Sequence, residues 1–427
     1  NTVNQKFTFD ATDKLSFYAR GGYYDNKTRR PYEAYDYNIL HETFNYGIGA
    51  QYMINKGNYI TADCYADHFS SSYCFFKDNK TYNGKAGEEQ VRKRTRNHNL
   101  SIKGIFKLGN RHKLSVGTEY IVDVLKSQTD NIAKEDAYTL ALFAQDEIKL
   151  LRNLQALIGV RYIYHENFKN HATPNVALMY KPGKFNFRAS YAAGFRTPTL
   201  SELYATDIAK KNDRLTIGNL DLKPEKNNYF SLSAEYVHER FSVSVNAFYN
   251  NIRDMIDYNT IATGDKAMEQ YGHKEVRQRD NIAEAKVHGI NVSANAYLGA
   301  GFNLSGGYTH LNTQDVELEQ PIDKSIKNAY NINAQWAHSW KIYRLNINLN
   351  GRFNSKRFSK SYGYAPEYQL WDLNTRHSFN LKSVIIEPGC GMENLFDYMD
   401  DRPYNSNYAT LTPGRSFYIS LSLKFKS

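Results

Sequence analysis

The sequence contains none of the compact residue patterns that enzymes use for catalysis. It has no G-x-S-x-G nucleophile turn, no H-E-x-x-H zinc helix, no phosphate-binding loop and no G-x-G-x-x-G dinucleotide fingerprint. Paired carboxylates occur at Glu88-Glu89 and Asp400-Asp401, in polar segments where solvent exposure explains them. The three cysteines have no metal-ligand spacing and predict no disulfide framework. We therefore expect that the protein is not an enzyme and has no intrinsic cofactor.

The charged residues do not by themselves decide the function. Lys and Arg number 54 against 44 Asp and Glu, which gives a formal net charge of +10. The densest basic run is residues 92–96, with the sequence Arg-Lys-Arg-Thr-Arg. Such a run could attract an anionic ligand, the phosphates of lipopolysaccharide or no ligand at all, and charge alone leaves these alternatives open.

The elements that position these residues are visible as alternating patterns. In the segment 416–425, apolar Phe, Ile and Leu alternate with Ser, Tyr and Lys, and similar alternation occurs at 230–236, 241–250 and 345–350. Successive side chains of a strand point to opposite faces, so each segment is predicted to be a strand with one apolar and one polar face. The apolar face is expected to include Val243, Val245, Leu345, Ile347, Leu349, Leu421 and Leu423.

Short and long connections alternate along the whole chain. Nine short turns are predicted, including Lys56-Gly57 and Gly109-Asn110. The long polar connections are expected at about residues 26–40, 77–97, 127–136, 164–172, 195–226, 257–284, 312–327, 355–369 and 396–415. Nine connections of each kind imply about 19 strands. Hairpins with tight turns at one end and long loops at the other are typical of a transmembrane antiparallel up-and-down β-barrel, which is the predicted all-β fold.

A barrel of this kind also accounts for the composition. Hydrophobic residues make up 41% of the chain, mean hydropathy is −0.65, and no run approaches the roughly 18 apolar residues of a membrane-spanning helix. Only one face of each barrel strand must be apolar, so low hydropathy is expected. The 35 Tyr residues fit aromatic girdles at the two membrane interfaces, as well as the general preference of Tyr for strands.

Two segments resemble a known family. They are Tyr191 to Tyr204, YAAGFRTPTLSELY, and Gly218 to Glu225, GNLDLKPE, which are similar to the paired boxes of TonB-dependent outer-membrane receptors. The box residues are Phe195, Arg196, Pro198, Asn219, Leu222, Pro224 and Glu225. Further similar segments follow the family's order at 142–147, 159–162, 174–182, 393–397 and 413–417.

The resemblance implies more than the fold. That family has a 22-stranded barrel with an N-terminal plug domain and an energy-coupling segment. Residues 1–427 are therefore expected to be the outer-membrane β-barrel domain, without the plug and the first strands. The implied function is TonB-dependent active uptake of a metal chelate, namely haem, another ferric complex or cobalamin, captured by extracellular loops. The alternative is a passive porin-like channel or surface-binding barrel, and a soluble carbohydrate-binding repeat protein fits the alternating turns poorly.

The implied partners are the outer-membrane lipid and lipopolysaccharide, the inner-membrane TonB complex, the chelate and a surface lipoprotein, with no nucleic acid. Haem iron accepts His or Tyr as axial ligand. Haem receptors of the family typically carry a His between the two boxes, and this sequence has Tyr204 there instead. The candidate ligand-binding residues are Arg196, Tyr204, His98, His165, His171 and His273. For Arg196 and Pro198 we favour shaping the exit of the loop from its strand over ligand contact, and each His is open to interpretation as an ordinary solvated loop residue.

Overall fold

The computed structural model describes residues 1–32, 35–80, 82–209, 213–359, 363–399, 412 and 414–425. The first ten strands are β1 (Thr2–Thr12), β2 (Leu15–Tyr32), β3 (Tyr35–Asn55), β4 (Asn58–Phe75), β5 (Glu89–Leu108), β6 (His112–Ser127), β7 (Ile132–Leu151), β8 (Leu154–His165), β9 (Lys169–Tyr180) and β10 (Phe185–Arg196). The middle of the chain contains α1 (Leu200–Tyr204), β11 (Thr206–Ala209), β12 (Arg214–Ile217), β13 (Glu225–Val237), β14 (Phe241–Thr263), α2 (Gly264–Tyr271) and β15 (Glu275–Gly299). The remaining strands are β16 (Phe302–Asp315), β17 (Asn328–Trp340), β18 (Tyr343–Asn354), β19 (Arg357–Ser359), β20 (Gly363–Ala365), β21 (Tyr368–Asn380), β22 (Val384–Glu393) and β23 (Ser416–Phe425).

The number of strands confirms the sequence prediction. The main sheet of the described residues has 21 strands, and β11 and β12 are four-residue strands inside one connection. The other 19 are the strands expected from the alternating connections. The strand predicted at the end of the chain is β23, with the predicted bounds.

The chain divides into two compact units. Unit 1 consists of Asn1–Val176, Ala192–Asn227 and Arg253–Ala283, and unit 2 consists of Ala177–Tyr191, Asn228–Ile252 and Glu284–Ser427. In unit 1, strands β1 to β8 pair in chain order, each antiparallel to the next. In unit 2, β15 to β18 and then β21 to β23 pair in the same way. Both units are therefore built from consecutive hairpins.

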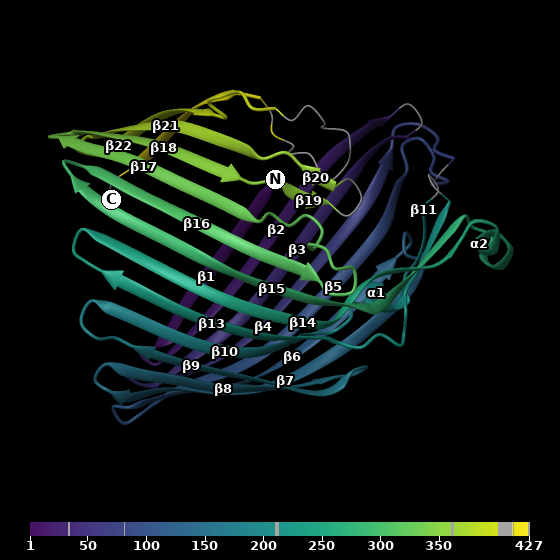
Figure 1. The fold of residues 1–427 in the computed structure, drawn as a ribbon, viewed down its shortest axis with the longest axis horizontal. Helices are drawn as coiled ribbons and strands as arrows, with labels where there is room; N and C mark the ends of the chain where they lie inside the picture. Colours follow the sequence, from purple (N-terminus) through teal and green to yellow (C-terminus); the bar gives the residue numbers. More distant parts are fainter. Residues whose placement is uncertain are drawn as a thin grey trace. The chain divides into compact units, whose positions relative to one another are not determined.

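The tight turns lie where the sequence places them, because glycine allows them there. In the turn between β3 and β4, Gly57 has a φ of 98°, and between β5 and β6 Gly109 has a φ of 61°. These are left-handed conformations that glycine adopts without steric cost. At the opposite ends of the strands, α1, β11 and α2 lie among the longer connections (Figure 1).

Several long connections are shorter than the sequence suggests, because the strands continue as paired ribbons. β2 and β3 stay in register to Tyr32 opposite Tyr35, so the expected loop at 26–40 is largely strand. The predicted loop at 77–97 also contains the start of β5, and the predicted loop at 164–172 contains the end of β8 and the start of β9. Pairing beyond a membrane needs no apolar face, so hydropathy does not reveal these extensions. Most of the predicted connection at 396–415, including Asp400 and Asp401, lies outside the described residues.

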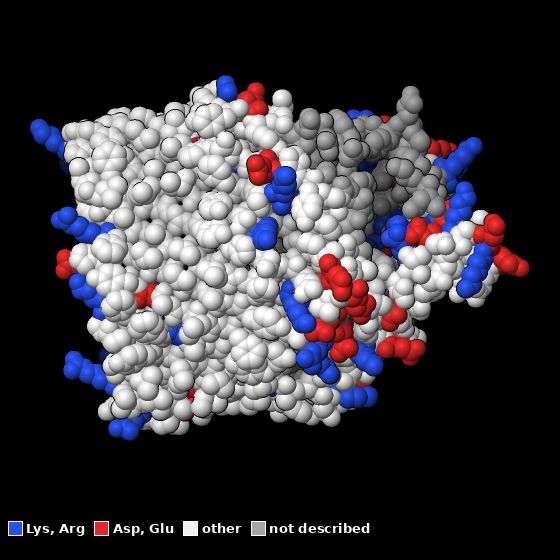
Figure 2. Space-filling view, viewed as in Figure 1, with Lys and Arg blue, Asp and Glu red and all other residues white. Residues whose placement is uncertain are grey.

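The long strands separate an apolar from a polar face, as β5 illustrates. On β5, Leu100 and Ile102 are 48% and 45% exposed on one face, while Asn99, Ser101 and Lys103 alternate with them on the other. Over the strands of unit 2, Figure 2 shows a broad surface with few charged side chains. Among the described residues, no helix has the length and hydropathy needed to span a membrane. Large exposed apolar side chains on one face of each strand are the pattern expected where lipid covers that face.

Candidate functional site

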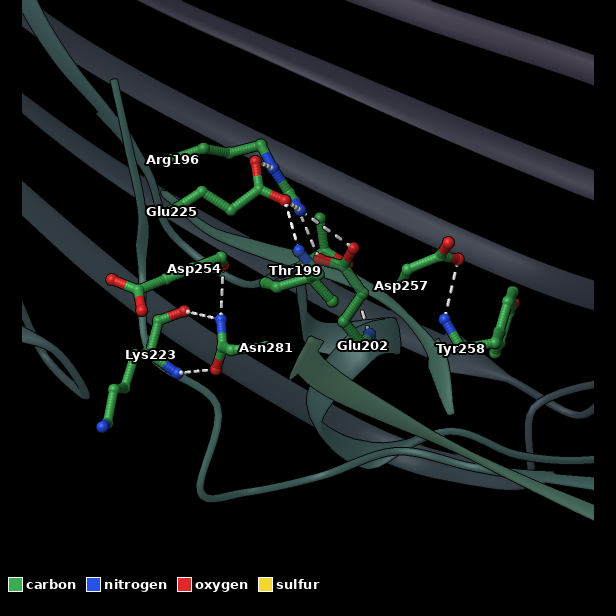
Figure 3. A network of polar contacts seen from close by, with 10 residues as sticks. Arg196, Thr199, Glu202, Lys223, Glu225, Asp254, Asp257, Tyr258 and Asn281 are labelled. Atoms are coloured by element: carbon green, nitrogen blue, oxygen red, sulfur yellow. Dashed lines mark hydrogen bonds and ion pairs between the residues drawn. The ribbon is translucent and has the colours of Figure 1, made fainter. Parts of the chain in front are cut away.

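Arg196, the last residue of β10, lies at the centre of an ion-pair network in unit 1. Its guanidinium donates to both carboxylate oxygens of Glu225, at 2.8 and 2.6 Å, and to both of Glu202, at 2.8 and 3.2 Å. The two Glu side chains are only 13% and 15% exposed, whereas Arg196 is 42% exposed. We call these three residues the Arg196 clamp. The clamp joins the end of β10, the helix α1 and the start of β13 (Figure 3).

Local sequence explains how Glu202 reaches the clamp. Thr199 caps the N-terminus of α1: its hydroxyl accepts from the Glu202 amide at 3.2 Å, and its own amide donates to the Glu202 carboxylate at 2.8 Å. This reciprocal pair is a capping box, which the pattern Thr-x-x-Glu favours at a helix start. Pro198, directly before the cap, is buried. The cap therefore holds Glu202 so that its carboxylate faces Arg196.

The clamp changes the proton affinity of its members. Hydrogen bonds to Glu225 and Glu202 raise the pKa of Arg196 above its ordinary value. Burial acts to raise the pKa of Glu202, but the hydrogen bonds from Arg196 and Thr199 outweigh it, so the pKa lies below its ordinary value. Both groups therefore stay charged near neutral pH, and their charges satisfy one another.

Two further connections are tied to the same place. The amide of Ile256 donates to Glu225 at 2.8 Å, which brings in β14. Asn281 on β15 accepts from the Lys223 amide at 2.7 Å and donates to the carbonyls of Lys223 and Asp254, at 2.9 and 2.6 Å (Figure 3). The site is thus assembled from segments more than 80 residues apart in the sequence.

An apolar cluster lies beside the polar network. Leu203, Leu222 and Ile256 are buried together, and Phe168 and Tyr204 pack against them. Gly218 allows the chain to come close: an added Cβ would lie 2.5 Å from the Leu203 carbonyl oxygen. Asn219 is held there by a bond of 3.0 Å from its amide to the Glu202 carbonyl, and Pro224 is buried. The box residues therefore hold the base of the connection between β10 and β13.

Two of the predicted histidines adjoin this cluster. The ring of His171 stacks on Phe195 with centroids 4.5 Å apart, and its Nε2 lies 3.0 Å from the Phe168 carbonyl oxygen. His165 is buried, and its ring lies 5.0 Å from that of Phe168. Its Nδ1 accepts from the Asn167 amide. The structure therefore brings His165, His171 and Tyr204 to the same set of packed aromatic residues.

The other two predicted histidines lie elsewhere. His273, just before β15, has its Nδ1 2.8 Å from the Asp213 carboxylate. That hydrogen bond lowers the pKa of Asp213. His98 lies within β5 on the same face as Leu100, and its ring centroid is 5.4 Å from that of His68. The six candidates therefore do not form one cage.

The candidate residues can be assessed as ligands of a metal ion. Within the described part of the chain, no group of three or more His, Cys, Asp or Glu side chains could hold a metal ion. Burial, together with Glu135 and Glu166, raises the pKa of Tyr204, which disfavours the phenolate form that coordinates iron. Tyr204 therefore suits packing and loop positioning better than metal coordination.

Sequence reasoning identified Arg196 and Glu225 but missed Glu202, which pairs with Arg196, and Asn281, which binds the backbone of Lys223 and Asp254. Glu202 was available from the capping-box spacing that begins at Thr199. Asn281 had no local signal, because its hydrogen bonds join segments that meet only in the folded sheet.

The comparisons with known proteins agree with this fold. Residues 1–394 match the family model described as TonB dependent receptor-like, beta-barrel. A mutant of the ferric enterobactin receptor PfeA from Pseudomonas aeruginosa is similar in structure, with a TM-score of 0.81 and 17% identity over 100% of this chain and 69% of that chain. For the siderophore receptor PirA from the same species the values are 0.74 and 16%, over 100% and 71%. The FrpB iron transporter from Neisseria meningitidis gives 0.75 and 13%, over 99% and 71%. At these identities the likeness shows the shared barrel fold.

Proposed function

The chain belongs to the TonB-dependent receptor-like β-barrel family of the bacterial outer membrane, and on that premise we propose that it takes up a ferric chelate of the siderophore type. The family consists of transport receptors for metal chelates. Three similar structures are named as receptors for ferric enterobactin or siderophores or as an iron transporter, which supports iron as the cargo. Active, TonB-energised uptake is part of this proposal and is a property of the complete receptor.

One observation in this chain carries the choice of ligand. The guanidinium of Arg279 on β15 lies 3.6 Å from the centroid of the Tyr258 ring on β14, and its Nη2 donates to the Tyr258 hydroxyl at 2.6 Å. Both residues are accessible and lie beyond the clamp, on the parts of β14 and β15 that flank α2. A cation stacked on an aromatic ring offers an anionic aromatic chelator both a charge and a flat surface.

Haem has less support from the structure. One ring nitrogen of His165 is hydrogen-bonded to the Asn167 amide and one of His171 to the Phe168 carbonyl, and Tyr204 packs in the apolar cluster. An axial ligand must present a free nitrogen or oxygen toward the iron. We place haem and cobalamin below a ferric siderophore because the similar structures are named for ferric enterobactin, siderophores or iron.

The proposal is tested by titrating the purified complete receptor with a ferric tricatecholate and following tryptophan fluorescence. Saturable quenching is expected, and Arg279→Ala should weaken binding at least tenfold. Arg240→Ala, which removes the same charge from the tight turn between β13 and β14, should leave the affinity unchanged.

The same preparation distinguishes the alternatives. A Soret shift with haem that is abolished by replacing His165, His171, His273 or Tyr204 would establish a haem receptor instead. Tight quenching by cobalamin alone would establish a corrinoid receptor. Failure of every chelate to bind, combined with steady ion conductance of the complete protein, would establish a passive pore.

A further inference from the structure

The apolar face of strands β2 to β5 carries an unexpected set of basic residues. Arg94 and Arg96 on β5 lie on the same face as Leu100 and Ile102. His98 is on this face too, between Arg96 and Leu100. Across the sheet, Arg96 is paired with His68 on β4. We call Arg94, Arg96, His68 and His98 the basic band. These residues belong to strands, whereas the sequence pattern places the whole run 92–96 in the long connection at 77–97.

The depth of the band can be estimated from strand geometry. Ten residue steps separate Arg96 from Phe106, which lies on the same face near the tight turn after β5. At about 3.3 Å per residue and a tilt of about 40°, this corresponds to about 25 Å along the membrane normal. The apolar zone of an outer-membrane barrel is also about 25 Å tall. Arg96 therefore lies at the outer border of that zone, at the level of lipid headgroups.

The neighbours of Arg96 agree with this depth. Pairing across the sheet places Tyr23 opposite Phe44, Phe44 opposite His68, and His68 opposite Arg96. Tyr23 and Phe44 are exposed on the apolar face. Aromatic side chains at this position form the girdle at a membrane interface. The arginines therefore project among the aromatic residues of the outer girdle.

The basic band has unused binding capacity. Among the described residues, neither Arg94 nor Arg96 has a carboxylate within ion-pair distance, whereas Arg196 has two. The nearby acid, Glu42, accepts from the Tyr23 hydroxyl at 2.9 Å. Arg94, Arg96, His68 and Glu42 line a pocket of about 240 Å³, and in the described structure the buried Nε2 of His68 has no hydrogen-bond partner. Charged and polar groups at an interface normally acquire such partners.

An apolar groove lies deeper on the same strands. It has a volume of about 550 Å³ and is lined by the small residues Ala19, Ala50 and Ala62 together with the large apolar residues Phe17, Ile48 and Leu100. On β5, the groove reaches Leu100, four residues from Arg96. The separation is about 13 Å along the strand. The basic pocket and the apolar groove therefore follow one another along the membrane normal.

We propose that the two features form one binding site for a phosphate-bearing lipid of the outer leaflet, with lipopolysaccharide as the occupant. Arg94 and Arg96 bind a lipid A phosphate, for which the guanidinium is well suited because it makes bidentate, charge-assisted hydrogen bonds. His68 donates or accepts a further hydrogen bond, and an acyl chain fills the groove between the small residues. This site is on the lipid-facing side of unit 1 and is separate from the capture of the chelate.

The test measures lipid binding to the purified complete receptor by native mass spectrometry, with lipid A carrying both phosphates as the probe. The double variant Arg94→Gln/Arg96→Gln should weaken binding at least tenfold. The matched control Lys103→Gln/Arg111→Gln removes two charges from the polar face and the tight turn of the same hairpin, and should bind as the unmodified receptor does. Fully dephosphorylated lipid A should bind weakly to both variants alike.

Two further arms separate the parts of the site. Ala62→Phe fills the groove and should lower the affinity for lipid A, whereas Ala144→Phe on the same kind of face of β7 should not. Inorganic phosphate, added at the same molar concentration as lipid A, should not displace the bound lipid, because phosphate has no acyl chains to fill the groove. Circular dichroism and resistance to unfolding in detergent confirm that each variant is folded. Equal binding of lipid A by the Arg94→Gln/Arg96→Gln variant and the unmodified receptor would overturn the proposal, and so would displacement of the lipid by equimolar phosphate.

Discussion

Arginine plays two different roles in two regions of unit 1. In the Arg196 clamp, the guanidinium is bound by two largely buried carboxylates, and its hydrogen-bonding capacity is spent on holding three segments together. In the basic band, Arg94 and Arg96 lie on the apolar face with no carboxylate partner among the described residues. The comparison shows that residue type alone does not indicate the role of an arginine. An arginine with carboxylate partners supports the fold, whereas one without them is available to bind a ligand.

The largest expected effect comes from an arginine placed too deep on the apolar face. Ile102→Arg puts the charge six residues nearer the tight turn than Arg96, inside the zone that lipid tails cover. It should cost about 2–4 kcal/mol of folding free energy. Ser101→Arg, on the polar face beside it, should cost much less. Urea titration of the barrel folded into lipid vesicles measures both, and equal costs would show that the two faces have been assigned wrongly.

Removing the central charge of the clamp should have the next largest effect. Arg196→Ala leaves the carboxylates of Glu202 and Glu225 without their counter-ion, and should cost about 2–3 kcal/mol of local stability. This figure is below that of a fully buried pair because Arg196 is 42% exposed. Hydrogen exchange of residues 197–209 and 213–224 reports the loss. Unchanged protection there would mean that the clamp does not hold the connection.

The clamp should also weaken in acid. The pKa of Glu202 in the folded protein is below its ordinary value of 4.5, so its ionised form contributes stability above that pH. The contribution is lost as the pH falls through the folded pKa. The protection factors of the α1 amides should therefore be constant from about pH 6 to 8 and fall below about pH 4.5. Glu202→Gln should abolish this acid step, and a step that persists in the variant would assign it to another group.

The smallest expected effect is that of the basic band on stability. Because Arg94 and Arg96 have no ion pairs within the described structure, replacing both by Gln should change the unfolding free energy by less than about 0.5 kcal/mol in detergent without lipopolysaccharide. The same measurement after adding lipid A should show stabilisation of the unmodified receptor only. A large loss of stability without lipid would show that these arginines are structural, as Arg196 is.

The sequence predicts more of the fold than of the site. Alternation and glycine-containing turns such as Gly57 locate the strands, since lipid imposes an apolar face and tight turns need left-handed residues. The strand extension to Tyr32 is hidden, because no apolar face is required beyond the membrane. In the site, the resemblance identifies Arg196 and Glu225, but the role of Asn281 depends on pairing between distant strands. The basic band is hidden for a different reason: the sequence places 77–97 in a loop, whereas β5 begins at Glu89 and puts Arg94 and Arg96 on the face of Leu100.

Growth of a strain lacking this receptor tests the uptake of a ferric chelate most directly. On iron-limited medium, the strain should fail to grow with a ferric tricatecholate as the only iron source and should grow normally on haem or with cobalamin as the only corrinoid. The complete receptor should restore growth, Arg240→Ala should restore it equally, and Arg279→Ala should restore it only at higher chelate concentration. Normal growth on the ferric tricatecholate, with a defect confined to haem or cobalamin, would contradict the proposed ligand.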